Sequence, residues 1–257
     1  MLIRLYEALR SKIIDWSLCL KHVLGIRTTL LRLQSGEHMQ IRNSDIVGRL
    51  ILKGRYEPAL RNVLVSQVRA GMTVLDVGAN IGYYTVQLAN MVGACGRVLA
   101  FEPNPVLCDE LKCNIDLNHF TNTLVFPFAL SDSFGESSFY LPADGLEAHG
   151  SLKMNSTFEV IQCIRVRTRK LDEVLSETVI AGIGFMKIDV EGAEGLIMRG
   201  ARGLLTSRTK PVVLFECSET LCSRFGFRVF DILKEIVSLG YNVEQIDYGN
   251  WLARPNP

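Results

Sequence analysis

A glycine-spaced turn follows the apolar run 74–77, whose third residue is Asp76. The turn covers residues 78–82 and contains Gly78, Asn80 and Gly82, and an amphipathic segment comes after it. Glycine permits a positive φ and lets a ligand approach the backbone closely. A strand, a glycine turn and a helix N-terminus together bring several backbone N–H groups to one point. This order of residues predicts a cradle for a nucleoside-bearing cofactor.

A second acid, Glu102, ends the next apolar run at 97–101. A carboxylate in this position can accept hydrogen bonds from both hydroxyls of a ribose. The turn by itself is also compatible with an ordinary loop between a strand and a helix, and Glu102 favours the cofactor site. The spacing G-x-x-x-G lacks the central glycine of the dinucleotide fingerprint. Asp76 would also repel a phosphate, whereas it would attract a sulfonium or an amino group.

A cluster of charged residues lies in segment 184–194, and its members are Lys187, Asp189, Glu191 and Glu194. Glu216 ends another apolar run at 211–215. Ligands of open parallel sheets bind outside the carboxyl ends of the strands. Carboxylates that leave water need a cation, a donor or a ligand beside them. These acids predict a site for a polar or cationic group, although Asp189 or Glu191 could instead cap a helix.

Alternating strand and helix patterns surround these motifs. We expect strands at 73–77, 97–101, 123–127, 183–189 and 211–216, helices at 82–92, 104–117, 193–206 and 228–239, and a final strand pair near 241–246 and 250–253. This alternation predicts an α/β fold with a parallel sheet and helices on both faces. Residues 129–170 interrupt it with short strands at 137–141 and 161–167 and a polar loop at 142–156, after which a brief helix is expected at 171–175. A long loop inside a compact domain is usually functional or mobile.

The N-terminal part is expected to form a helical extension over residues 1–70, ahead of a main domain at 71–257. Residues 1–32 predict an amphipathic helix with a local excess of four positive charges. Such a helix can make peripheral contact with a membrane surface, or it can pack its apolar stripe on its own domain. A short strand is expected at 39–42, and a helix over 44–70 that is interrupted near Gly54 and Pro58.

Composition excludes several classes of protein. The 257 residues are 48% hydrophobic and 21% charged, which is typical of a globular chain with a large core. The net charge of +1 gives no electrostatic reason to expect nucleic acid as a partner. The seven cysteines lack metal-ligand spacing, so we expect reduced core thiols in a cytoplasmic protein. We expect no export signal, no transmembrane segment and no dedicated metal site.

The motifs together resemble a known family. Segments 74–85, 101–104 and 187–194 are similar to motifs of the FkbM family of class I S-adenosylmethionine-dependent methyltransferases. Shorter matches at 54–58, 129–132 and 171–172 support the resemblance, which covers roughly residues 50–220. It implies a Rossmann-like open sheet and S-adenosyl-L-methionine as the cofactor.

The resemblance also implies roles for individual residues. Asp76, Gly78, Asn80 and Gly82 would line the methionine end of the cofactor, Glu102 would bind the ribose, and Asn104 would stand beside ribose and adenine. Ser131 and Asp132 would contact the adenine, and Glu57 would approach the cofactor from the N-terminal side. Tyr83 could wall the pocket or belong to the core.

The implied reaction is O-methylation of a hydroxyl on a sugar, polyketide or related small metabolite. Asp189 is the first candidate for orienting the acceptor or taking its proton, with Glu191, Lys187 and Glu216 at the same mouth. His149, in the polar loop, has a pKa suited to a general base but could simply be solvated. A magnesium ion held by Asp189 and Glu216 is a minor alternative.

Two other classes of function stay open from the sequence. One is an NAD(P)-dependent oxidoreductase on a related fold, which the missing central glycine disfavours. The other is a non-catalytic module that keeps the fold and docks to a membrane or a synthase through residues 1–32. The acceptor and the oligomeric state do not follow from the sequence.

Overall fold

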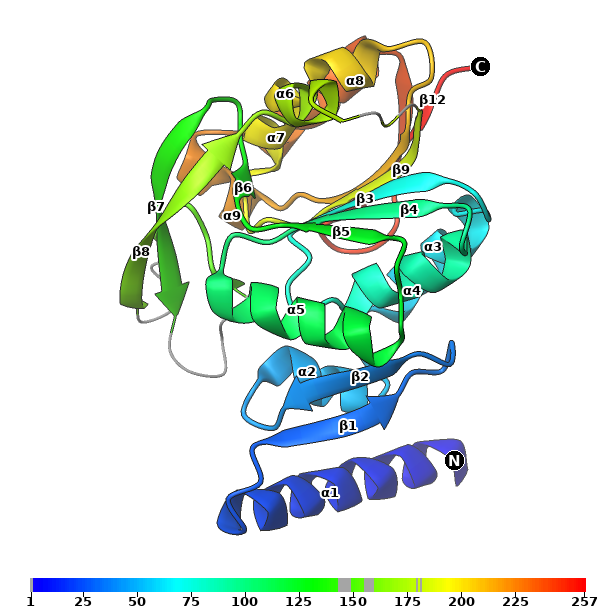
Figure 1. Ribbon diagram of the computed structural model, residues 1–257, viewed down its shortest axis with the longest axis vertical. Coiled ribbons are helices and arrows are strands. Elements are labelled where there is room, and N and C mark those ends of the chain that lie inside the picture. Colours follow the sequence, from blue (N-terminus) through cyan, green and yellow to red (C-terminus); the bar gives the residue numbers. More distant parts are fainter. Residues whose placement is uncertain (1, 143–148, 155–159, 179, 181) are drawn as a thin grey trace.

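The structure is a computed structural model that describes residues 2–142, 149–154, 160–178, 180 and 182–257. Its centre is a seven-stranded sheet with the order β11-β12-β10-β9-β3-β4-β5 (Figure 1). The strands are β3 (Thr73–Val77), β4 (Arg97–Phe101), β5 (Thr123–Phe126), β9 (Ile183–Ile188), β10 (Val212–Glu216), β11 (Tyr241–Gln245) and β12 (Asn250–Pro255). Strand β12 runs antiparallel to both of its neighbours, and the other pairings are parallel.

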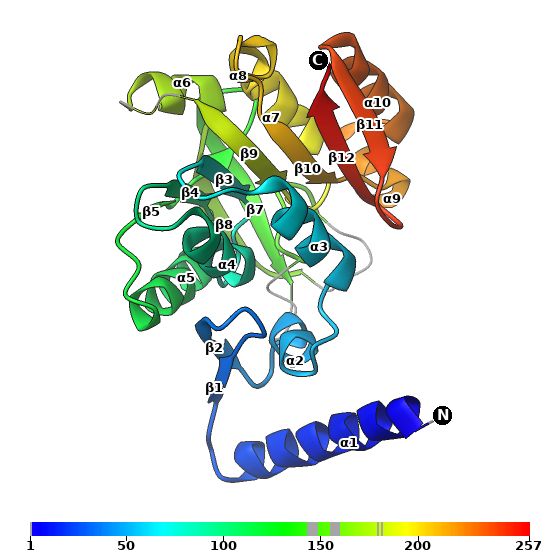
Figure 2. The same ribbon diagram turned by 90° about the vertical axis from the view of Figure 1, so that its right-hand side faces the viewer.

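Helices cover both faces of this sheet, as the alternation predicted (Figures 1 and 2). One face carries α3 (Pro58–Gln67), α4 (Tyr83–Val92) and α5 (Pro105–Leu117). The other carries α6 (Leu171–Ser176), α7 (Glu194–Gly200), α8 (Arg202–Thr206) and α10 (Val229–Ser238). A short helix α9 (Glu219–Cys222) and the 3-10 turn η2 (Ser223–Phe225) follow β10.

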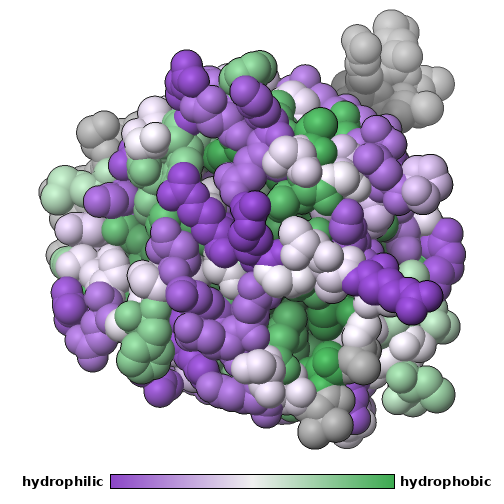
Figure 3. All heavy atoms as spheres, turned by 90° about the horizontal axis from the view of Figure 1, so that it is seen from above, coloured by the Kyte–Doolittle hydropathy of each residue, from purple (hydrophilic) through white to green (hydrophobic). Residues whose placement is uncertain are grey.

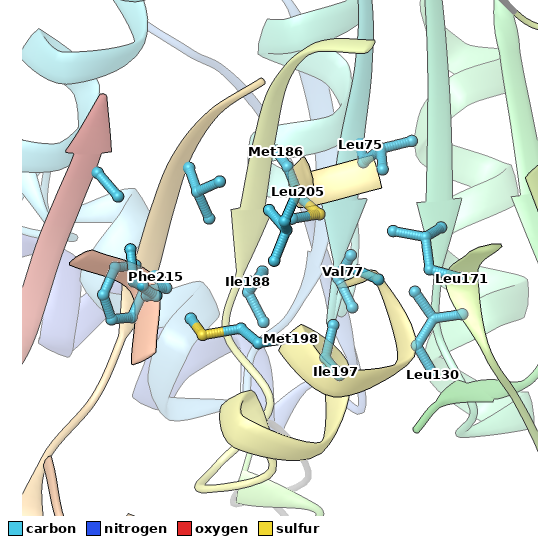
Figure 4. Close-up of a cluster of buried hydrophobic side chains, with 14 of the residues drawn as sticks. Leu75, Val77, Leu130, Leu171, Met186, Ile188, Ile197, Met198, Leu205 and Phe215 are labelled. Atoms are coloured by element: carbon cyan, nitrogen blue, oxygen red, sulfur yellow. The ribbon is translucent and has the colours of Figure 1, made fainter. Parts of the chain in front are cut away.

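Strand alternation sorts the core into two layers. Leu75 and Val77 of β3 pack with Met186 and Ile188 of β9 beneath α7 and α8, as Figure 4 shows. The intervening residues Val74 and Phe185 face α3 and α4. On that second face the next positions of β3 and β9 are not apolar but are Asp76 and Lys187, which are register partners. The alternation therefore places two charged side chains inside the sheet–helix interface.

Two expected helices differ from the structure. The first, α1 (Leu2–Val23), ends before residue 32 because Gly25 takes a left-handed φ of 72° and Ile26 N–H bonds back to Lys21 O. Residues Thr28–Arg32 form the strand β1 instead, which pairs with β2 (His38–Arg42).

The helix expected at 193–206 is broken at Ala201 into α7 and α8. The Asp172 carboxylate accepts the N–H groups of Gly203 and Leu204, at 2.6 and 2.9 Å, and so begins a new helix there.

The N-terminal residues pack onto the sheet domain. Helix α2 (Ile46–Leu52) begins at Asp45, whose carboxylate accepts the Gly48 N–H at 2.6 Å. Met39, Ile41 and Val47 form one apolar cluster with Ile81 of the main domain. Within the described residues, no helix is both long enough and apolar enough to cross a bilayer. The boundary between residues 70 and 71 stays a prediction.

A second, smaller sheet follows β5. It consists of β6 (Ala129–Leu130), β8 (Val160–Arg169) and β7 (Gly135–Pro142) in that order, and it confirms the strands expected at 137–141 and 161–167. Strand β6 was not expected, because a strand of two residues is too short to show an alternating hydrophobic pattern. The polar loop expected at 142–156 lies partly outside the described residues, which include His149–Met154.

The seven cysteines are free, as expected, but the prediction that they are core thiols is wrong for four of them. Cys108, Cys217 and Cys222 are buried, whereas Cys19, Cys95, Cys113 and Cys163 are exposed. Cys19, Cys113 and Cys163 lie on helices or a strand of which one face meets solvent, and Cys95 lies in the turn between α4 and β4.

Gly78 is required by packing as well as by conformation. Its φ is 79°, and a Cβ at this position would lie 1.8 Å from Asp189 O. Gly71 has a similar φ of 82°, yet a Cβ there would meet nothing within 4 Å. The two glycines therefore form a matched pair that separates backbone strain from a steric clash.

We expect Gly71→Ala to lower the free energy of unfolding by about 1–2 kcal/mol, the cost of a left-handed alanine. Gly78→Ala should lose about 1–3 kcal/mol more, because β3 and β9 must separate to admit the methyl group. Urea denaturation of both variants measures the difference. Equal losses would show that the close approach of Asp189 is unimportant.

Candidate active site

A pocket opens at the carboxyl ends of β3, β4, β9 and β10, with an empty volume of about 1260 Å³ that includes its open mouth. Helix α2 and the segment 149–152 also contribute to its wall. The tertiary structure brings nine of the predicted site residues into this lining: Glu57, Gly78, Asn80, Glu102, His149, Lys187, Asp189, Glu191 and Glu216.

Glu102 organises the half of the pocket next to the glycine turn. It is 4% exposed, and its two carboxylate oxygens accept the backbone N–H groups of Asn80 and Asn104, at 2.9 and 2.8 Å. Burial raises its pKa to about 7, although these two hydrogen bonds act in the opposite direction. A carboxylate has about four acceptor sites, so each oxygen retains the capacity for one more donor.

The turn itself is held by its own side chain. Asn80 has a left-handed φ of 52°, and its side-chain oxygen accepts the Ile81 N–H at 2.7 Å. The backbone N–H groups of Gly78 and Ala79 both donate to Phe101 O. These contacts fasten the turn to the end of β4, next to Glu102.

Five predicted cofactor residues lie outside the pocket lining: Asp76, Gly82, Asn104, Ser131 and Asp132. Gly82 begins α4 with a φ of 92°, and a Cβ there would lie 2.7 Å from Leu111 Cδ1. Asn104 begins α5 by accepting the Val106 N–H. Gly82 and Asn104 support the wall through α4 and α5, and direct cofactor contact stays a prediction for all five.

Ser131 and Asp132 lie beyond the pocket because the chain turns away after β6. The Ser131 hydroxyl is 3.4 Å from the Asp132 carboxylate, and its backbone N–H donates to Arg169 O. The apolar residues before them, Phe128, Ala129 and Leu130, line the pocket in their place.

A buried ammonium group stands at the centre of the acidic cluster. Lys187 Nζ is 3.0 Å from Asp189 Oδ2 and lies 4.5 Å from the centre of the Tyr84 ring. Burial acts to lower its pKa, but the carboxylates of Asp189, Asp76 and Glu57 outweigh that effect and raise it. Lys187 therefore keeps its charge and balances the acids around it.

Asp76 belongs to this network rather than to the pocket surface. It is fully buried, and its Oδ2 accepts the Thr85 hydroxyl at 2.6 Å. Its Oδ1 has no hydrogen-bond partner among the described residues. Burial raises its pKa, while Lys187 and the Thr85 hydroxyl lower it.

The N-terminal extension supplies residues to the same cluster. Glu57, with a left-handed φ of 40°, accepts a hydrogen bond from the Tyr84 hydroxyl. Burial and the Asp189 charge raise the pKa of Glu57. The rings of Tyr56 and Tyr83 meet edge to face at 5.1 Å between centroids, and both line the pocket.

Glu216 faces Asp189 from the next strand. Burial, followed by the charges of Asp189 and Glu191, raises the pKa of Glu216 well above its usual range. This shift favours the protonated carboxyl group of Glu216, which can donate a hydrogen bond, whereas Asp189 is the partner of the lysine ammonium.

His149 also reaches the cluster. Its Nδ1 is 2.8 Å from Glu191 Oε1, and this contact is the main reason that its pKa is raised. Ser151 donates to Glu191 O at 3.1 Å. Glu194 fastens the turn from beneath, since its carboxylate accepts the N–H groups of Val190 and Gly192.

Sequence reasoning missed the apolar part of the lining and one aromatic wall. Ile46 and Leu50 of α2 line the pocket together with Leu107, Phe139 and Leu152. These five residues come from four segments that are distant in the sequence. No periodic pattern connects such segments. Tyr56 was within reach, because it lies in the motif 54–58 beside Glu57.

Comparison with known protein families finds a match over most of the sheet domain. The family model described as "Methyltransferase FkbM domain" matches residues 76–243.

Three curated relatives are similar over about half of the chain. The "AMB antimetabolite synthetase AmbE" of Pseudomonas aeruginosa is 28% identical over 55% of this chain and 8% of its own length. The "31-O-demethyl-FK506 methyltransferase FkbM" of Streptomyces tacrolimicus is 29% identical over 57% of this chain and 66% of its own. The "2-O-methyltransferase NoeI" of Sinorhizobium fredii is 26% identical over 52% of this chain and 58% of its own. The chain thus spans less than two thirds of each of these relatives.

Among solved structures, a "putative rRNA-methylase" from Clostridium thermocellum is similar with a TM-score of 0.48 and 13% sequence identity. The match covers 76% of this chain and 90% of that chain.

Removing the buried cation should destabilise the protein strongly. We expect Lys187→Met to lower the free energy of unfolding by about 3–5 kcal/mol, because buried carboxylates lose their counter-charge. Lys187→Met/Asp189→Asn should recover part of that loss, since one of the unpaired charges is then gone. Urea denaturation of the two single variants and the double variant gives this coupling. A double variant that loses the sum of both single effects would contradict the pairing.

Proposed function

The chain belongs to the methyltransferase FkbM domain family, and we propose that it transfers a methyl group from S-adenosyl-L-methionine to a hydroxyl of a small metabolite. The acceptor class is a sugar, a polyketide or a related molecule. One observation carries the proposal: Glu102, at the end of β4, and the Lys187–Asp189 pair, at the end of β9, face a single pocket.

The cradle suits the ribose of this cofactor. Each Glu102 oxygen already accepts one backbone N–H and can accept one more donor, which matches two neighbouring hydroxyls. The apolar side chains of Phe101, Leu107 and Phe128 offer a dry surface for a purine ring. Glu102 would hold the ribose, Asn80 would line the methionine end next to it, and Glu57 and Asp189 would stand near a positive sulfonium.

When bound, the cofactor supplies an electrophilic methyl group on a sulfonium. The residues of the chain must then orient the acceptor oxygen and receive its proton. Asp189 is the candidate for both tasks, because its carboxylate lines the pocket and Lys187 fixes its position at 3.0 Å. The protonated Glu216 would donate a hydrogen bond to the acceptor.

His149 suits a supporting role better than that of the base. Its raised pKa and its contact with Glu191 favour the imidazolium, which donates protons and cannot accept one. We therefore assign His149 and Glu191 to the wall that receives the acceptor, with Ser151 holding the backbone of Glu191.

The names of two relatives support a hydroxyl acceptor. One is named for a 31-O position and the other for a 2-O position. The family assignment does not favour the NAD(P)-dependent oxidoreductase. The free cysteines, four of them exposed, support a reducing compartment such as the cytoplasm.

Cofactor affinity should depend on pH through Glu102. The ionised carboxylate accepts the ribose hydroxyls, and its pKa of about 7 means that protonation removes this acceptor as the pH falls. We expect affinity for S-adenosylmethionine to fall about tenfold from about pH 8 to about pH 6. Isothermal calorimetry measures this affinity at each pH.

Glu102→Gln should bind S-adenosylmethionine at least about tenfold more weakly than the native protein, and its affinity should not change with pH. No binding at millimolar cofactor would overturn the proposed function.

Asp189→Asn should abolish turnover while leaving cofactor binding intact. The amide can still accept from Lys187 but cannot take a proton, so we expect a loss of at least about a hundredfold in rate. Release of S-adenosylhomocysteine with a panel of sugar and polyketide alcohols measures turnover. Asp109→Asn, a surface acid paired with Lys112, is the matched control. Activity like that of the native protein in Asp189→Asn would remove Asp189 from the mechanism.

A further inference from the structure

Helix α1 presents an apolar stripe to solvent. The stripe consists of Tyr6, Leu9, Ile13, Trp16, Leu20 and Val23, which recur every three or four residues and are between 45% and 76% exposed. Leu24, Ile26 and Leu30, which follow the helix, are also exposed, by 45% to 63%. The apolar residues of α1 could in principle pack on the protein itself, but these six do not.

The other side of α1 is fixed to the protein. Leu18 is buried at 6% exposure, on the side of the helix opposite the stripe. Asp15 pairs with Lys53 at 2.7 Å and with Arg49 at 3.4 Å, both at α2. Lys21 donates to the Thr29 hydroxyl of β1. The orientation of the helix is therefore set by its own contacts, and they direct the stripe outward.

Figures 1 and 2 show α1 as an outer layer at the foot of the molecule, beyond β1 and β2. The opposite end, seen in Figure 3, is a mixed surface on which apolar residues lie among many hydrophilic ones. A continuous exposed apolar stripe of this length marks an interaction surface rather than ordinary surface composition.

The charges beside the stripe indicate what covers it. Arg10 and Lys12 are exposed and flank the stripe on its two sides, while Asp15 is turned toward α2. Arg27 adds a further exposed cation just after the helix. A second copy of α1 packed on this stripe would bring these cations close to their own kind. An anionic surface complements them.

We propose that α1 lies in the surface of an anionic lipid bilayer. The stripe would enter the boundary between head groups and acyl chains, with Trp16 near its middle, and Arg10, Lys12 and Arg27 would meet the anionic head groups. Because α1 is paired with α2, and α2 lines the pocket through Ile46 and Leu50, the bound helix would hold the pocket at a fixed distance from the membrane.

Sedimentation of the full chain with vesicles tests this proposal. We expect binding to vesicles of phosphatidylserine and phosphatidylcholine in equal parts, and much weaker binding to phosphatidylcholine alone or at high salt. Ile13→Gln/Trp16→Gln should weaken binding on the order of a hundredfold, because the variant loses two apolar side chains that would be buried in the bilayer. Arg10→Gln/Lys12→Gln should cost about fivefold per charge.

Matched controls remove similar groups elsewhere. Phe134→Gln takes away an apolar side chain that is 75% exposed outside α1, and Arg97→Gln/Arg208→Gln removes two exposed cations. Both controls should bind vesicles as the native protein does. Circular dichroism of each variant shows whether α1 is kept. The chain also contains Trp251, so a blue shift of tryptophan emission on vesicle addition that is absent from Ile13→Gln/Trp16→Gln reports insertion of Trp16 independently of sedimentation.

Three results would overturn the proposal. The first is equal binding to anionic and neutral vesicles, and the second is no binding together with no shift in the tryptophan emission of the native protein. The third is a concentration-dependent dimer in light scattering that Ile13→Gln/Trp16→Gln abolishes, because the stripe would then join two copies of the chain. Cofactor binding, measured on the same samples, does not depend on vesicle binding. Failure of the membrane proposal can therefore be distinguished from failure of the proposed function.

Discussion

The charge balance around Lys187 is the interaction on which the rest of the site depends. A buried ammonium is costly unless carboxylates surround it, and buried carboxylates need a cation in turn. Here Asp189 contacts Lys187 directly, and Asp76 is the register partner of Lys187 on the neighbouring strand β3. Glu57, from the N-terminal extension, is the third carboxylate that raises the pKa of Lys187. Three separate parts of the chain must therefore be in place before any of these groups is stable.

A second constraint joins the cofactor cradle to the acidic cluster. The backbone of Gly78 approaches Asp189 O so closely that a Cβ would not fit. Asp189 N–H in turn donates to Val77 O at 3.0 Å. The turn after β3 and the turn after β9 are thus one rigid unit, and a ligand on the glycine turn is held at a fixed distance from the candidate base.

The N-terminal extension links the pocket to the outer surface. Its inner part supplies Tyr56 and Glu57 to the acidic cluster and the apolar side chains of α2 to the pocket wall. Its outer part, α1, is tied to α2 by the carboxylate of Asp15. Whatever binds α1 therefore acts on an element that touches the active site, which gives the extension a part in positioning as well as in packing.

The sequence by itself determined the fold class and most of the site, because both are written in local patterns. Alternating strand and helix periods predicted the sheet, and acids at strand ends predicted the pocket residues Glu102, Asp189 and Glu216. Only the tertiary structure decided which side of each strand a residue occupies relative to its neighbours across the sheet. That is why Asp76 lies in the core with Thr85. The structure also shows that Asn104 and Gly82, which begin α5 and α4, support walls rather than face the pocket. It also decided that the stripe of α1 faces outward, since a helical period shows that a face is apolar but not what the face meets.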